Sequence, residues 1–280
     1  MGNGSSWALV TGASSGLGLA LAEECAARGR NLFLAALPAS GLPEVSRSIA
    51  AKRRVSVEWM EADLTEPEAP ARLVEKLQST GARIDLLVNN AGIGAIGRFE
   101  ESVLEEQEAI IRLNVLALVR LTRAFVGELK NGRPAHILNV ASLSAFFPMP
   151  YLPIYSATKS FVVSFSLALR NELAGSIGVS VLCPNTIRNN QGVNDYIERL
   201  DLASRLACLT PECIARIALD GVARNRAVIV PGLLNRFLHL CSHLIPREIS
   251  MKAICHYWGK YGQVEKEARE EARKAAALES

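Results

Sequence analysis

The sequence predicts one α/β domain built on a doubly wound parallel β-sheet of about seven strands, with helices on both faces. Two observations predict it. Short apolar segments alternate with helix-length segments along most of the chain, and a glycine-rich turn follows the first apolar segment. The 280 residues, 49% of them hydrophobic and 21% charged, suffice for a substantial core. We expect the sheet domain over residues 1–232, followed by a helical extension, amphipathic and then charged, over 233–280.

The predicted strands are apolar runs without polar alternation, a pattern typical of parallel strands covered on both faces. They are expected at residues 6–11, 31–37, 55–61, 84–89, 135–140, 178–183 and 227–230. Helices are expected between them at residues 16–28, 43–52, 67–80, 103–129 and 154–173. This regular exchange of strand and helix predicts a single parallel sheet.

Two segments depart from the alternation. Residues 184–210 are polar and irregular, and we expect the part from about 190 to 210 to form a lid over a substrate, although it also fits a loop packed on itself. Beyond residue 232, an amphipathic stretch reaches about residue 261, and a tail of alternating charges follows. The amphipathic stretch fits core packing, a subunit contact or docking on a membrane surface.

The glycine-rich turn, T-G-A-S-S-G-L-G at residues 11–18, lies between the first expected strand and the first expected helix. Glycine permits a tight turn and a close backbone approach, and the positive end of the helix favours a pyrophosphate. The turn therefore predicts a nucleotide site of the Rossmann type. The residues expected to bind there are Gly12, Ser14, Ser15, Gly16, Leu17 and Gly18.

The end of the second expected strand bears on the choice between NAD and NADP. A carboxylate there hydrogen-bonds the ribose hydroxyls of NAD, whereas a basic residue accommodates the 2′-phosphate of NADP. The sequence Ala35-Ala36-Leu37-Pro38 supplies neither. The missing acid favours NADP(H) over NAD(H), and the sequence leaves both open.

Six separated motifs, in this order, resemble the classical short-chain dehydrogenases/reductases over about residues 7–232. They are the glycine turn, Asp63, Asn89-Asn90-Ala91-Gly92, Asn114, Ser142 and Tyr155-x-x-x-Lys159. The resemblance implies an NAD(P)-dependent oxidoreductase that needs no metal. It further implies cofactor contacts from Asp63, Leu64, Asn90, Ala91, Gly92, Tyr155, Lys159, Pro184, Asn185 and Ile187.

Tyr155 and Lys159 lie four residues apart at the start of an expected helix, on one face. A nearby ammonium favours the phenolate, so we expect Lys159 to lower the pKa of Tyr155 and make it a usable acid and base. Ser142, thirteen residues earlier, follows an expected strand and suits a hydrogen bond to the substrate oxygen. A surface tyrosine beside a solvated lysine is the alternative for the pair alone.

Asn114 interrupts an apolar helical pattern, and the resemblance implies a helix kink and a water-held proton relay to Lys159 there; satisfying a backbone group is the alternative. The chain departs from the family after the sixth strand. Asn185 stands where glycine is usual, which suggests a left-handed backbone, and Asn189 stands where a threonine is usual.

We expect a carbonyl reductase, or dehydrogenase of the matching alcohol, acting on a lipophilic small molecule. Apolar side chains expected to line its pocket are Leu143, Phe146, Phe147, Tyr151 and Leu152. A catalytically silent nucleotide sensor or scaffold is the alternative, and an epimerase or dehydratase is a third. The small net charge of +3 gives no reason to expect a nucleic-acid partner. With no apolar run long enough to span a bilayer and no signal-peptide pattern, we expect a cytoplasmic homodimer or homotetramer.

Overall fold

The computed structural model describes residues 6–130, 134–187 and 207–245, together with 252 and 254. Seven strands form one sheet in the order β3-β2-β1-β4-β5-β6-β7, and every neighbouring pair is parallel. The strands are β1 (Trp7–Thr11), β2 (Asn31–Ala36), β3 (Val57–Glu61), β4 (Ile84–Asn89), β5 (Ala135–Val140), β6 (Ile177–Leu182) and β7 (Val228–Ile229). The predicted fold class is confirmed.

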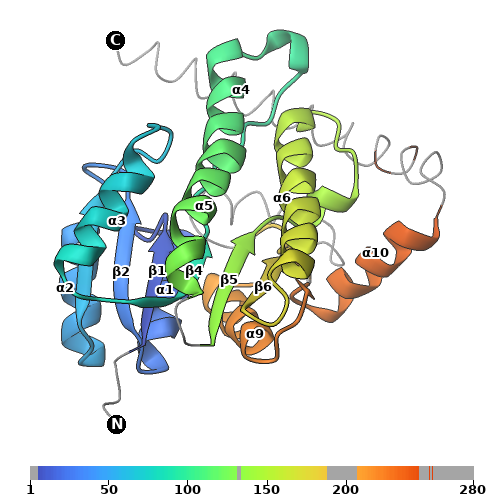
Figure 1. Cartoon of the computed structure of the whole chain (residues 1–280). Coiled ribbons are helices and arrows are strands. Elements are labelled where there is room, and N and C mark those ends of the chain that lie inside the picture. Colours follow the sequence, from blue (N-terminus) through green and yellow to red (C-terminus); the bar gives the residue numbers. More distant parts are fainter. Residues whose placement is uncertain (1–5, 131–133, 188–206, 246–251, 253, 255–280) are drawn as a thin grey trace.

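Helices cover both faces of this sheet (Figure 1). One face carries α1 (Gly16–Ala27), α2 (Leu42–Arg53) and α9 (Pro211–Ala223), and the other carries α3 (Ala69–Ser79), α5 (Leu118–Leu129) and α6 (Pro153–Glu172). Successive strand residues therefore enter opposite cores. In β2, Leu32 packs toward α1, whereas Phe33 packs toward α3 and α5. Burial on both sides explains why the strands show no polar alternation.

The long helix expected at 103–129 is interrupted. It consists of α4 (Leu104–Ile111), a π-helical turn η2 (Arg112–Ala117) and α5. A 3₁₀ turn, η1 (Phe99–Glu101), precedes α4. Helical periodicity alone does not distinguish a π turn inside an apolar helix, and such turns are frequent at functional sites.

The sequence analysis missed α9, which lies between the sixth and seventh strands. Its start carries ordinary signals, since Thr210 caps the helix by accepting a hydrogen bond from the Cys213 N–H and Pro211 occupies the first turn. α9 packs along α1, so it completes the layer on its face of the sheet.

The chain continues beyond the sheet into α10 (Leu233–Leu244), which packs on the 3₁₀ turn η3 (Leu143–Phe146). Leu233, Phe237, Leu240 and Leu244 remain exposed on its outer side. The expected charged tail and most of the expected lid lie outside the described residues. No helix in the described ranges is long and apolar enough to cross a membrane.

Candidate active site

A cavity of about 1300 Å³ opens at the carboxyl ends of the strands. Its lining includes residues that directly follow β1, β2, β4, β5 and β6, such as Gly12, Leu37, Asn90, Ala141 and Pro184. The chain winds outward in opposite directions from the adjacent strands β1 and β4, and ligands of doubly wound sheets bind at this reversal. Every predicted cofactor residue lines the cavity, as does Ser142; among the predicted catalytic and cofactor-binding residues, only Asn114 is not part of the lining.

The glycine turn forms a cradle that larger residues would fill. Gly12 and Gly16 have φ of 65° and 54°, a region that favours glycine. A Cβ on Gly18 would lie 1.9 Å from the Gly12 carbonyl oxygen, so helix and turn meet only because residue 18 is glycine. Ser15 makes no side-chain cap to α1, which leaves the first N–H groups of that helix available to an anion.

Thr11 and Asn90 hold the second side of this cradle. The Thr11 hydroxyl accepts hydrogen bonds from the N–H groups of Asn90 and Ala91 at 3.0 and 3.1 Å, and the Asn90 amide donates to the Thr11 carbonyl at 2.8 Å. The ends of β1 and β4 are thus locked together beside the turn. A dinucleotide pyrophosphate and ribose fit the chemistry of this cradle.

The far end of the cavity is formed by the ends of β2 and β3. Asp63 accepts hydrogen bonds from the N–H and hydroxyl groups of Thr65, at 2.9 and 2.8 Å, and the two residues line the cavity together. Leu37 is 55% exposed, and the buried Ser40 hydroxyl oxygen has no hydrogen-bond partner among the described residues. A buried hydroxyl without a partner fits the polar edge of a nucleoside at this end.

Tyr155 and Lys159 project from the first turns of α6, as their spacing predicts, and meet Ser142 at the end of β5. The Lys159 ammonium donates to the Val140 carbonyl oxygen at 3.0 Å and lies 5.6 Å from the centroid of the Tyr155 ring. Burial lowers the pKa of Lys159 to about 8, with the nearby Cys183 acting in the opposite direction.

The expected lowering of the Tyr155 pKa is wrong for this structure. Burial raises the pKa of the phenol above its usual value, and a side-chain hydrogen bond with Ser142 opposes that shift. Desolvation outweighs that hydrogen bond, because burial disfavours the charged phenolate. The Lys159 ammonium meanwhile bonds to a backbone carbonyl.

Asn114 sits in the π turn and is 2% exposed. Its side-chain oxygen accepts from the Ile93 N–H at 3.0 Å, and its amide donates to the Ile93 carbonyl at 2.9 Å and to the Thr158 hydroxyl at 3.1 Å. Asn114 therefore fixes the strand-end segment after β4 against α6, next to Lys159. These contacts are the ones expected if Asn114 serves to satisfy backbone hydrogen-bonding groups, which is the alternative interpretation of this residue.

The segment after β6 differs from expectation at Asn185. This residue is not among those with positive φ, so a left-handed backbone is not the reason that asparagine stands there. Its side chain is used instead. The amide donates to Asn235 at 3.0 Å and the oxygen accepts from the Thr186 N–H at 2.8 Å. Asn189 lies outside the described residues.

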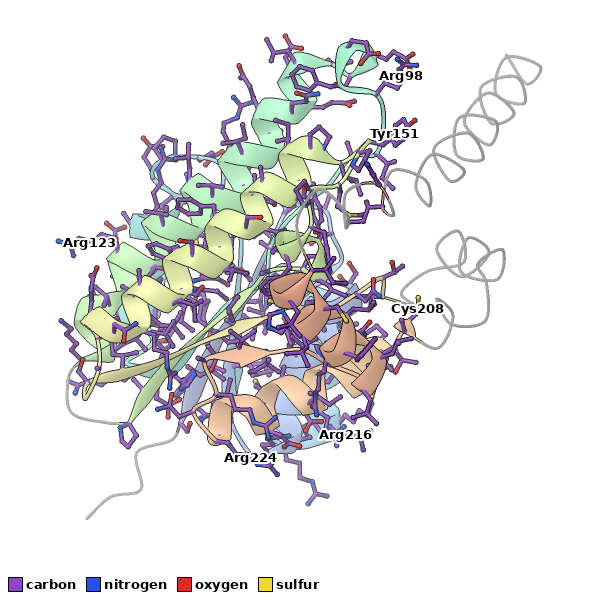
Figure 2. All side chains as sticks on the ribbon, turned by 90° about the vertical axis from the view of Figure 1, so that its right-hand side faces the viewer. Arg98, Arg123, Tyr151, Cys208, Arg216 and Arg224 are labelled. Atoms are coloured by element: carbon purple, nitrogen blue, oxygen red, sulfur yellow. The ribbon has the colours of Figure 1, made fainter. Side chains whose placement is uncertain are left out.

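The apolar end of the cavity is built partly as predicted. Leu143, Phe147 and Leu152 line it, but Phe146 and Tyr151 do not. Phe146 instead packs on His239 of α10, with ring centroids 4.2 Å apart. Tyr151 has a left-handed backbone, and Figure 2 places it at the same end of the molecule as Arg98.

Sequence reasoning missed the wall supplied by α10. Leu234 and Leu238 line the cavity, four residues apart on one side of this helix, and Cys208 and Met149 add to the same apolar end. Apolar residues occur on more than one face of α10. The helical periodicity of the sequence therefore does not show which of these faces lines a cavity.

A comparison with family models decides the family. Residues 6–196 match the model described as short chain dehydrogenase. The chain belongs to the short-chain dehydrogenase/reductase family. It therefore carries the domain of an NAD(P)-dependent dehydrogenase or reductase, as the motifs predict.

Relatives within the short-chain dehydrogenases include 1-deoxy-11-beta-hydroxypentalenate dehydrogenase from Streptomyces exfoliatus. It is 37% identical over 184 residues, which span 64% of this chain and 66% of that enzyme. A bulky-bulky ketone specific alcohol dehydrogenase from Comamonas testosteroni has a similar structure, with a TM-score of 0.72 and 26% identity over 96% of this chain and 95% of that one.

Two further short-chain dehydrogenase structures contain cofactor. One from Sphingobium yanoikuyae, in complex with NADPH, has a TM-score of 0.74 and 32% identity over 88% of this chain and 95% of that one. One from Burkholderia phymatum, in complex with NAD, has a TM-score of 0.74 and 26% identity over 87% of this chain and 96% of that one. Both neighbours bind a nicotinamide cofactor, but one binds NADPH and the other binds NAD.

Proposed function

We propose that this short-chain dehydrogenase reduces a lipophilic ketone, or oxidises the matching alcohol, with NADP(H), using Tyr155 as the acid and base. The observation that carries the proposal is the meeting of Tyr155, Ser142 and Lys159 between the glycine cradle and an apolar wall. When bound, the cofactor supplies or accepts the hydride. A ketone held at Tyr155 would have its carbon toward the cradle and its apolar groups toward α10.

Tyr155 delivers the proton in this proposal. In reduction, its phenol donates to the carbonyl oxygen as negative charge develops there. Burial raises the pKa of Tyr155, which keeps the phenol protonated at neutral pH and suits it to donation. In oxidation the same oxygen takes the proton back, and the raised pKa makes loss of the phenolic proton harder.

Ser142 and Lys159 assist from two sides. The Ser142 hydroxyl bonds with Tyr155 and stands ready to donate to the substrate oxygen. Lys159 is fixed by the Val140 carbonyl and has two further N–H donors for a cofactor ribose hydroxyl. Its positive charge near the phenol would stabilise negative charge on the Tyr155 oxygen during proton transfer.

The cavity wall supports a lipophilic substrate. Leu143, Phe147, Leu152, Leu234 and Leu238 surround the end beyond Tyr155. Apolar surface of this kind stabilises a bound ligand in proportion to the apolar area removed from water. The bulky ketones named for the Comamonas structure fit such a wall.

NADP(H) is the proposed cofactor because β2 ends without a carboxylate. Ala36 and Leu37 line the cavity where an acid would repel the 2′-phosphate, and Ser40 offers a hydroxyl there.

We also propose a homodimer or homotetramer formed through α4, α5 and α6. Ile111 in α4, Leu116 in the π turn η2 between α4 and α5, and Phe161 in α6 are each about 40% exposed, and Phe161 stacks on Phe165. Light scattering tests this proposal: a dimeric or tetrameric mass supports it, and a monomeric mass at micromolar concentration overturns it.

The proposed reaction is tested by titrating the full chain with NADPH and NADH, followed by turnover of ketones of increasing apolar size. We expect tighter binding of NADPH and a kcat/KM that rises with the buried apolar area of the ketone. Binding without turnover of any ketone would favour a nucleotide sensor instead. Tighter binding of NADH would overturn the cofactor proposal.

A further inference from the structure

Asn235 is a buried asparagine in the first turn of α10, and it joins three separate segments of the chain. Its side chain is 1% exposed. The amide donates to the Ala207 carbonyl at 2.9 Å and to the Pro231 carbonyl at 2.8 Å. The side-chain oxygen accepts from the Asn185 amide at 3.0 Å. Both amide protons and the oxygen are therefore engaged.

All three segments reach the cavity. Asn185 belongs to the lining after β6, Ala207 and Cys208 line the cavity ahead of α9, and α10 contributes Leu234 and Leu238. Asn235 itself does not line the cavity and stands behind this junction. A shift of its side chain would move the cofactor side and the substrate side together.

The surroundings of position 235 fit an asparagine side chain. Gly232 precedes it with a φ of 90°, and a Cβ on Gly232 would lie 3.2 Å from the Asn235 amide nitrogen. An apolar side chain at position 235 would leave the Ala207 and Pro231 carbonyls without these donors, and burial of unpaired carbonyls is costly. A residue that served only to pack α10 would need none of these three bonds.

We infer that Asn235 is a positioning residue that holds Asn185 at the cofactor side of the cavity while it fixes the α10 wall on the substrate side. The inference rests on the proposed function, because Asn185 contacts a cofactor only if the cavity that it lines binds NADP(H). Two hydrogen bonds, one with the Asn235 side chain and one with the Thr186 N–H, fix the orientation of the Asn185 side-chain amide. Loss of Asn235 frees the Asn185 side chain to rotate away.

A double-mutant cycle on NADPH affinity tests this inference. We compare the wild type, Asn235→Ala, Asn185→Ala and the double variant, with Kd measured by NADPH fluorescence. Loss of the Asn185–Asn235 hydrogen bond, which both single variants share, predicts a Kd raised by about three- to tenfold in each of them. Because both changes break the same contact, the double variant should be no weaker than the weaker single variant.

Asn139→Ala is the matched control. Asn139 is a fully buried asparagine of β5 that bonds to Asn89 and Ser166 and does not line the cavity. We expect it to lower Tm without changing the Kd for NADPH. Asn235→Ala should also raise the KM of the ketone, because Leu234 and Leu238 move with the start of α10. Asn235→Ser, which keeps one donor, should fall between Asn235→Ala and the wild type.

The outcomes separate the two proposals. Failure of the wild type to bind NADPH would overturn the proposed function. If the wild type binds and turns over ketone, but Asn235→Ala and Asn235→Ser keep the wild-type Kd and KM, the inference is wrong. Multiplicative effects in the double variant would equally contradict it, because they would show that Asn235 acts without Asn185. If Asn235→Ala does not fold, Asn235→Ser with Asn185→Ala completes the same cycle.

Discussion

Gly94 lies directly against the ring of Tyr155. A Cβ built on Gly94 would come within 2.8 Å of the Tyr155 Cδ2 atom and 3.2 Å of Cε2. Real side chains essentially never approach so closely, so any residue larger than glycine must push the ring away. The segment after β4 thereby sets where the Tyr155 hydroxyl stands relative to Ser142.

Gly94→Ala should lower kcat because the Tyr155 ring must shift. A misplacement on the order of 1 Å can cost about 100-fold in rate. Steady-state turnover of a lipophilic ketone measures the effect, with Gly97→Ala as the control, because a Cβ on Gly97 meets no atom within 4 Å. Equal rates for the two variants would show that Tyr155 tolerates the displacement.

Asn114→Ala should reduce both stability and turnover. It removes the two hydrogen bonds that Asn114 makes with the Ile93 N–H and carbonyl, and at roughly 0.5–1.5 kcal/mol for each bond this predicts a loss of about 1–3 kcal/mol in the free energy of unfolding. Urea unfolding measures this loss. Thr122→Val, which removes another buried partner at Asn89, is the control that should keep a normal kcat. A normal kcat in Asn114→Ala as well would limit Asn114 to a structural role.

Lys159→Met should abolish turnover and yet stabilise the protein at neutral pH. The native pKa of Lys159 is about 8, against an ordinary value of 10.5, because burial disfavours the ammonium. Between these values the unfolded state binds more protons than the native state, so wild-type stability rises with pH through this window. The Tm advantage of the variant should be largest below pH 8 and shrink toward pH 10.5. A gap in Tm that stays constant with pH would contradict a buried ammonium.

The buried side chain of His136 should make the folded protein less stable as the pH falls. Burial, assisted by Arg170 and Arg30, lowers its pKa from 6.5 to about 4, and its ring bonds to the Ser180 hydroxyl at 2.8 Å. The unfolded chain takes up a proton on this histidine below pH 6.5 while the native state does not, so stability falls between pH 6.5 and 4. Thermal unfolding at several pH values should show a shallower decline for His136→Gln. Parallel curves for the two proteins would rule this histidine out.

The sheet, the glycine cradle and the meeting of Ser142, Tyr155 and Lys159 could be predicted because each follows from short sequence patterns and from their order along the chain. Apolar strands buried on both faces, such as β2, carry their signature within six residues. Parallel strands end at one edge, so motifs that follow β1, β4 and β5 meet there however far apart they are in the chain.

What the sequence did not predict depends on three-dimensional surroundings. The π turn around Asn114 replaces i,i+4 bonds by longer ones without changing the apolar pattern. The raised pKa of Tyr155 follows from the depth of burial, and the roles of Leu238 and Asn235 follow from where α10 returns to the sheet. The need for glycine at position 94 becomes clear only from its contact with the Tyr155 ring.

In the proposed reaction of this short-chain dehydrogenase, Tyr155 transfers the proton. The most direct test compares Tyr155→Phe with the wild type for NADPH affinity and for turnover of a lipophilic ketone, with Tyr151→Phe, outside the cavity lining, as the control. We expect Tyr155→Phe still to bind NADPH but to lose about 100-fold or more in kcat, the usual contribution of a positioned acid. Tyr151→Phe should behave as the wild type. Wild-type turnover by Tyr155→Phe would show that Tyr155 does not transfer the proton.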